Sequence, residues 1–405
     1  MHKFIATLTL VLCYLQSIAQ QQVFTREDSL NSNAVKHNTT VLSGYGQASY
    51  QRNNNNQTSK VNFDRFVLFV GHQFSSKISF FSETEIEHAK VEGGGSTGEI
   101  SLEQAYLKFM LNRDDYLLTG LILTRMGITN EDHLPVNYYG TERTMVETMI
   151  IPSTWRELGV GYYGKLRDYP LSYTVALVTG LNSEKFGNGK GIRESRFEGQ
   201  NATGNNLAIT GSLRYYTGDV RLQLAVYSGG SAGISPKRAD SLGLDSGPFG
   251  TPVHMGTLDA IYRKNGFQIK ALASYVSIPD AQKINTAYAN LAPQAMYGGY
   301  FEMGYNLLET FSHKNGQQLA LFARYELLDM NSKMYGTDLK DDALRQQHIV
   351  IGLNYFPIKN VVAKCDVRFQ RTGEQNKNLI LNPSPTALPY QQNNSYVNLG
   401  IGYAF

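Results

Sequence analysis

The sequence predicts an all-β protein, a 16-stranded antiparallel transmembrane β-barrel with short periplasmic turns and long external loops. Three observations support this prediction. Apolar and polar residues alternate with a period of two over many segments of strand length. Beyond the first twenty residues, no apolar run reaches the roughly 20 residues that a membrane-spanning helix needs. The connections between the alternating segments are short and long in turn, as in outer-membrane barrels.

The N-terminus has the features of a cleavable signal peptide over residues 1–20. A positive charge at Lys3 precedes an apolar run over residues 4–15, and small residues at Ser17 and Ala19 occupy the positions read by a signal peptidase. Residues 21–40 are polar and are expected to form a lead-in to a barrel over residues 41–405. The exported chain would then keep one cysteine, Cys365, and would have no internal disulfide.

The clearest alternation lies at the C-terminal end of the chain. Residues 397, 399, 401, 403 and 405 are apolar or aromatic, whereas residues 398, 400, 402 and 404 are polar or small. The segment from residue 361 alternates in the same way, with Lys364, Asp366 and Arg368 on its polar face. A soluble β-sandwich would also bury such an apolar face, so alternation alone does not place the chain in lipid.

The connections favour a membrane barrel more strongly than the strands do. Seven short turns and eight long polar segments join sixteen strands of about 10 to 13 residues, which is the length that a tilted strand needs to cross a membrane. The short turns are expected at 75–76, 112–115, 166–168, 217–219, 264–266, 313–316 and 357–360, and the long segments at 53–57, 91–98, 128–153, 182–205, 231–252, 279–293, 329–344 and 372–393. Within 99–111 the apolar phase changes, which predicts either a β-bulge or a misplaced strand boundary.

Composition and motifs argue against several other classes of protein. A formal charge of +3 and the lack of a Lys/Arg-rich run argue against nucleic-acid binding. Two G-x-S-x-G matches, at 94–98 and 229–233, do not follow a strand-to-helix elbow and are interpreted as loops. The eight histidines are scattered, and no metal or phosphate-binding motif is present. We therefore predict no catalytic residue, no metal and no cofactor.

A 16-stranded barrel encloses an aqueous lumen, so inward side chains are the candidate channel lining. The alternation places three glutamates and six basic residues inward, with Glu99 and Glu103 as further candidates. The nine are Glu83, Glu85, Glu87, Arg214, Arg221, Lys270, Arg324, Lys364 and Arg368. Either an acidic wall faces a basic wall across the lumen, or neighbouring acids such as Glu302, Glu326 and Asp366 neutralise the basic residues locally.

The segment 128–153, which follows the fifth strand, is the candidate constriction loop. Its charged candidates are Glu131, Glu142, Arg143 and Glu147, with Arg156 directly after it. One interpretation makes Arg143 and Arg156 contacts for solutes. The other pairs them with neighbouring glutamates, which would pin the loop to the barrel wall.

Several sequence blocks resemble Bacteroidetes-type outer-membrane porins of the phosphate-selective porin O and P family. The blocks are GHQF (71–74) followed by ISFFSE (78–83), EQAYL (103–107), IIPSTWRELG (150–159), RYE (324–326) and GLNYFP (352–357). The resemblance implies a homotrimeric barrel in the outer membrane of a Gram-negative bacterium that passes small hydrophilic solutes or inorganic anions such as phosphate. It also implies that the terminal Phe405 is recognised by the barrel insertion machinery. The lysine cluster of the family's anion-selective members has no counterpart in the long segments here.

Two alternatives to a porin stay open at this point. An outer-membrane barrel enzyme, a phospholipase or a protease, would need a Ser/His or Asp/His constellation at one rim. A plugged structural barrel would have the same strands without a conducting path.

Overall fold

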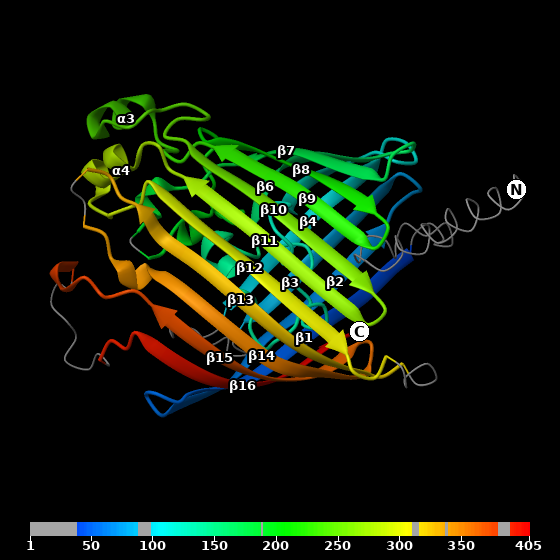
Figure 1. Ribbon diagram of the computed structural model, residues 1–405. Coiled ribbons are helices and arrows are strands. Elements are labelled where there is room, and N and C mark those ends of the chain that lie inside the picture. The colour runs from blue at the N-terminus through cyan, green and yellow to red at the C-terminus, as the bar shows by residue number, and fades with distance from the viewer. Residues whose placement is uncertain (1–38, 88–98, 188, 310–315, 337–338, 380–388) are drawn as a thin grey trace, which may run out of the picture.

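The protein is a closed barrel of sixteen antiparallel strands in the computed structural model, as the sequence predicts (Figure 1). The structure describes residues 39–87, 99–187, 189–309, 316–336, 339–379 and 389–405. The predicted signal peptide and most of the predicted lead-in lie outside these residues. The strands are β1 (Thr39–Asn53), β2 (Thr58–Gln73), β3 (Ile78–Glu87), β4 (Glu99–Met110), β5 (Tyr116–Leu123), β6 (Arg156–Leu166), β7 (Leu171–Thr179), β8 (Leu207–Thr217), β9 (Val220–Gly229), β10 (Val253–Lys264), β11 (Phe267–Ser277), β12 (Ala295–Asn306), β13 (Gln318–Lys333), β14 (Arg345–Ile358), β15 (Val361–Thr372) and β16 (Asn393–Ala404).

Helical segments are short and lie in the connections. They are η2 (Val146–Ile150), η3 (Ser183–Lys185), η4 (Arg193–Ser195), α3 (Pro236–Leu242), α4 (Ala281–Tyr288), η5 (Asp342–Leu344) and η6 (Lys377–Leu379). Within the described part of the chain, no helix is long and apolar enough to cross a membrane.

The first and last strands pair with each other and close the sheet. The Gly44 amide donates to the Phe405 carbonyl oxygen over 2.9 Å, and the Phe405 amide donates to the Gly44 carbonyl oxygen over 2.8 Å. The pairing continues from Tyr45 opposite Ala404 to Asn53 opposite Tyr396. Every other strand pairs with its sequence neighbours, so the backbone hydrogen bonds are satisfied around the ring without a free sheet edge.

A β-bulge interrupts β4 where the sequence changes phase, as predicted. Glu83 of β3 pairs with Gln104, but the next residue, Thr84, pairs with Leu102, so Glu103 is the extra residue. The bulge explains why Leu102 and Leu107 share the outer face although they are an odd number of residues apart. Its consequence is that the Glu103 side chain points into the barrel, where it is fully buried.

Short turns and long connections lie at opposite ends of the barrel, and the C-terminus lies at the short-turn end (Figure 1). The turn between β10 and β11 consists of Asn265 and Gly266, both with positive φ, as a two-residue type I′ turn requires. Two connections differ from prediction. Residues 54–57 form a tight turn, because the Asn53 side chain accepts the amides of Asn55 and Asn56. The connection from β12 to β13 spans residues 307–317, of which 310–315 lie outside the described residues.

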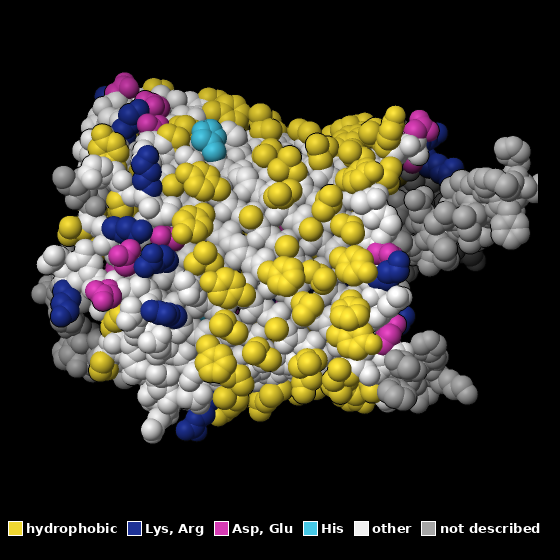
Figure 2. Space-filling view, in the orientation of Figure 1, with side chains coloured by type: hydrophobic (Ala, Val, Ile, Leu, Met, Phe, Trp, Pro, Cys, Tyr) yellow, Lys and Arg dark blue, Asp and Glu magenta, His cyan; other side chains and the backbone are white. Residues whose placement is uncertain are grey.

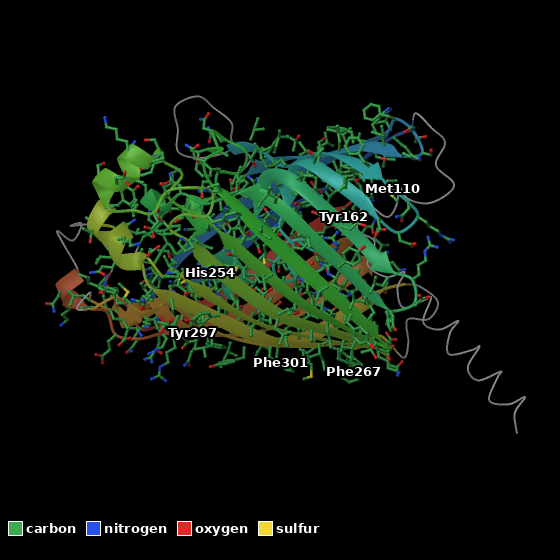
Figure 3. All side chains as sticks on the ribbon, turned by 90° about the horizontal axis from the view of Figure 1, so that it is seen from above. Met110, Tyr162, His254, Phe267, Tyr297 and Phe301 are labelled. Atoms are coloured by element: carbon green, nitrogen blue, oxygen red, sulfur yellow. The ribbon has the colours of Figure 1, made fainter. Side chains whose placement is uncertain are left out.

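Apolar side chains cover the outer surface of the barrel between its two ends. Figure 2 shows them over the strands, with charged side chains gathered toward the loop end and along the opposite rim. Phe267 and Phe301 point away from the barrel in Figure 3, and Leu399 and Ile401 of β16 are among the exposed residues. An exposed apolar belt of this kind is the lipid-facing surface of a membrane barrel.

Candidate functional site

The connection from β5 to β6, residues 124–155, folds into the barrel, and we call it the inserted loop. It contacts inward side chains of many strands, beginning with β1, where the Gln47 side chain donates to the Thr141 carbonyl oxygen over 2.9 Å. On the other side of the barrel, the Gln223 side chain of β9 donates to the Gly127 carbonyl oxygen over 3.2 Å. The predicted constriction segment 128–153 therefore lies within the lumen.

Glu147 is the centre of the hydrogen-bond network within the inserted loop. Its carboxylate is fully buried and accepts the backbone amides of Ile128 and Thr129, both over 2.6 Å. It also accepts the Thr129 hydroxyl over 2.7 Å and the Tyr300 hydroxyl of β12 over 2.8 Å. These bonds join the two limbs of the loop to each other and to the wall. Glu147 has no exposed surface to offer a solute.

Apolar packing holds the same loop against β12. Val146 and Ile150 are buried over Gly298, where a Cβ atom would lie only 3.0 Å from either side chain. Glycine thus permits the close approach of η2 to the wall. At the end of the loop Trp155 is fully buried, with its ring centroid 4.6 Å from that of Tyr227 on β9.

Basic side chains of the wall bind the backbone at the tip of the inserted loop. Lys364 Nζ on β15 donates to the carbonyl oxygens of Tyr138 and Gly140 over 2.9 and 2.8 Å. Arg324 Nη1 on β13 donates to the Tyr139 carbonyl oxygen over 3.2 Å. Both basic side chains are almost completely covered, so they support the loop.

The other basic residues of the predicted lining also point inward, and each has a partner. Arg221 lies 2.6 Å from Asp259, and Arg368 lies 3.1 Å from Glu142 of the inserted loop. Further partners are Glu131 for Arg214, the Asn137 carbonyl oxygen for Lys270, and both Glu302 and Glu326 for Arg324. The structure thus favours local neutralisation over a separate basic wall.

The three predicted acidic residues of β3 point inward as well. Arg65 of β2 lies 3.1 Å from Glu85 and 3.9 Å from Glu87, whose side chain is 36% exposed. Glu83 is buried and accepts the Gln104 side chain over 2.6 Å. The bulge of β4 turns the Glu103 side chain inward beside these glutamates. The side chain of Glu99 lies outside the part of the chain that the structure describes. The glutamates of β3 therefore also have neighbouring partners.

The remaining constriction candidates are held in place. Glu131 lies 2.8 Å from Arg125 in addition to its pairing with Arg214. Arg143 Nη2 lies 3.5 Å from the His133 carbonyl oxygen. Arg156 is the first residue of β6 and lies 3.1 Å from Glu198 of the connection between β7 and β8, so it is an ion-pair partner there and is not placed beside Arg143.

Two arginines of the connection from β7 to β8 have a role that the sequence did not reveal. Arg193 donates to the carbonyl oxygens of Thr148 and Ser153 over 3.1 and 2.8 Å. Arg196 donates to those of Pro152 and Thr154 over 2.8 and 2.7 Å. Burial lowers the pKa of Arg196 to about 10, which leaves it charged at neutral pH. The connection between β7 and β8 therefore holds the end of the inserted loop in place.

Charged side chains of both signs keep some exposure inside the barrel. Arg125, Asp132 and Arg263 lie near the short-turn end, and Glu87 and Glu142 lie elsewhere along the inserted loop and wall. These groups keep more exposed surface than the covered Lys364 and Arg324.

No family model matches the chain. Solved structures with the same fold include an anion-selective porin from Comamonas acidovorans, with 12% identity and a TM-score of 0.55 over 91% of this chain and 100% of that one. The outer-membrane channel DcaP of Acinetobacter baumannii has 15% identity and a TM-score of 0.55 over 91% and 98%. Salmonella typhi OmpF in complex with daunomycin has 13% identity and a TM-score of 0.55 over the same shares. At these identities the likeness shows the fold alone.

The closed 16-stranded barrel and its apolar outer belt place the protein in the outer membrane of a Gram-negative bacterium. A sequence relative comes from Aquifex aeolicus (strain VF5), where it is described as an uncharacterized protein. The two are 30% identical over 337 residues, which cover 80% of this chain and 74% of the relative. On that identity and coverage, the chain belongs to the same protein family as this Aquifex aeolicus relative.

Proposed function

We propose that the protein is an outer-membrane diffusion channel for small hydrophilic solutes, with the inserted loop as its constriction. The observation that supports this most is the inserted loop itself, which is held inside a closed barrel by buried bonds yet leaves charged side chains partly exposed beside it. Charged groups at membrane depth need water or partners. A water-filled path along the loop supplies that water, and the solute gradient supplies the driving force.

A preference for anions such as phosphate is the finer part of this proposal. Near the short-turn end, Lys108, Arg125, Arg214, Arg221 and Arg263 share the interior with Glu131, Asp132 and Asp259. Among the described residues of this group, five are basic and three are acidic, and an excess of one sign in a narrow passage favours counter-ions. Because most of these residues are paired, we expect the preference to be weak.

The direct test is single-channel recording of the purified, folded barrel in a planar bilayer under a KCl gradient. We expect discrete conductance steps and a reversal potential that shows a modest preference for chloride. Arg263→Glu should move the reversal potential toward cation preference. The control is Lys264→Glu, which makes the same charge change at the exposed end of β10, where Lys264 pairs with Asp219. A folded barrel without conductance would refute the channel.

The covered lysine at the loop tip gives a second test. Lys364→Met removes the donor to the Tyr138 and Gly140 carbonyl oxygens and should loosen the tip, so that single-channel conductance rises and closures become more frequent. Lys359→Met, in the exposed turn before β15, should leave the conductance unchanged. Equal conductance in both variants would show that the loop tip does not limit the pore.

The enzyme alternative has one structural observation in its favour. The Ser228 hydroxyl lies 3.0 Å from His254 Nδ1, and both residues are exposed on the outward face of β9 and β10. A serine hydrolase also needs a group that orients the other ring nitrogen and donors for the oxyanion. Among the described residues, His254 has no further recorded partner. The channel proposal expects no phospholipid hydrolysis by the purified barrel, and hydrolysis abolished by Ser228→Ala would favour the enzyme.

A further inference from the structure

Three metal-ligating side chains from separate elements meet in the barrel interior. They are Glu83 on β3, Glu103 at the bulge of β4 and His133 on the inserted loop. One nitrogen or oxygen atom from each residue lies within 4.8 Å of the other two, and all three side chains are buried. The cluster is separate from the Lys364 and Arg324 contacts that support the loop tip.

The imidazole ring of His133 is oriented as a metal ligand would be. Its Nδ1 atom lies 3.2 Å from the Asn130 carbonyl oxygen, which can only accept, so the tautomer that makes this bond carries its lone pair on Nε2. Nε2 makes no hydrogen bond and is buried. It lies 3.5 Å from Glu103 Oε2 and 3.8 Å from Glu83 Oε2. Nε2 and one oxygen of each carboxylate thus lie around a common point, where a single cation could be bound by all three.

Neighbouring donors hold both carboxylates in position. The Tyr45 hydroxyl donates to Glu103 Oε2 over 3.0 Å, and the Thr154 hydroxyl donates to Glu103 Oε1 over 2.8 Å. The Gln104 side chain donates to Glu83 over 2.6 Å. Metal-binding carboxylates and imidazoles in proteins are characteristically oriented by such outer hydrogen bonds.

We propose that Glu83, Glu103 and His133 bind a divalent first-row metal ion of the zinc type. Bonds of about 2.0 to 2.2 Å at tetrahedral angles place ligand atoms about 3.3 to 3.6 Å apart, so small shifts would complete the site. An imidazole nitrogen beside two carboxylate oxygens favours zinc or a similar ion over magnesium or calcium, which prefer oxygen ligands alone. The ion ties the inserted loop to β3 and β4, and its fourth position is open to water.

Cobalt binding to the full-length, detergent-purified barrel tests the site after treatment with a chelator. We expect one equivalent of Co²⁺ to give visible absorption bands of a low-symmetry nitrogen and oxygen site, and Zn²⁺ to abolish them. His133→Gln should remove the bands, whereas His254→Gln, at the exposed histidine of β10, should keep them. Tyr45→Phe keeps all three ligands and should weaken binding about 10- to 100-fold.

Two results would overturn this site. Wild-type barrel that binds no stoichiometric Co²⁺ or Zn²⁺ would mean that a protonated His133 bridges the two carboxylates without a metal. Binding unchanged in His133→Gln would place the ion elsewhere. If His133→Gln does not fold, the Tyr45→Phe variant tests the site instead. An affinity of that variant for Co²⁺ equal to that of the wild-type barrel would contradict Glu103 as a ligand. None of these measurements depends on conductance, so they stand apart from the channel proposal.

Discussion

Replacement of Glu147 by alanine is expected to destabilise the inserted loop more than any other single change in it. The substitution leaves the amides of Ile128 and Thr129 and the hydroxyl of Tyr300 without their buried acceptor. An unsatisfied buried donor costs about 1 to 3 kcal/mol, so the expected loss is on the order of 3 kcal/mol or more. Heat or denaturant unfolding of the purified barrel measures that loss.

The same variant should also change the channel. A loop released from β12 would fluctuate, and single-channel recordings should show larger and noisier conductance steps than the wild-type barrel. The matched control is Glu142→Ala, because Glu142 lies on the same loop, is partly exposed and pairs with Arg368. If Glu147→Ala and Glu142→Ala lose equal stability, Glu147 does not organise the loop.

Replacement of Leu399 by arginine should destabilise the barrel from its outer face. Leu399 is 46% exposed in the middle of β16, where it pairs with Tyr50 of β1 and Cys365 of β15. An arginine on the lipid face costs about 2 to 4 kcal/mol near the membrane midplane. A folding titration in lipid vesicles measures the cost.

The control for this position lies on the same strand and the same face. Asn393→Arg places the new charge at the long-loop end of β16, beside Arg371 of β15, where the expected cost is about 0 to 1 kcal/mol. A neutral effect of Leu399→Arg would contradict the assignment of this face to lipid.

The alternation of residues was sufficient to predict the barrel, because a strand exposes alternate side chains to opposite environments. It placed Leu399 outward and Lys364 and Arg368 inward without any knowledge of neighbours. The phase change within 99–111 likewise predicted a bulge or a misplaced boundary, and the pairing of β3 with β4 shows the bulge. The lengths of individual connections were predicted less well. One polar segment forms a tight turn because the Asn53 side chain accepts a backbone hydrogen bond within it, and amino-acid composition does not reveal such a bond.

The interior of the barrel could not be predicted in the same way, because its contacts join residues far apart in the chain. Lys364 was expected to face an open lumen, but its partners are carbonyl oxygens more than 220 residues away. No sequence pattern singles out Arg193 and Arg196, which the fold places against residues 148–154. His133 was one of several scattered histidines, and only the bulge of β4 and the path of the inserted loop bring it to Glu83 and Glu103.

The sequence by itself determined the class of this protein, since the two-residue period and the two classes of connection follow from the physics of strands in a membrane. The tertiary structure decided what the barrel contains. A folded loop can meet any inward side chain, and buried charges must find partners wherever the closed sheet places them. The pairing of Lys364 with Tyr138, and of Glu147 with Tyr300, is therefore a property of the closed barrel and is not encoded in any local pattern of residues.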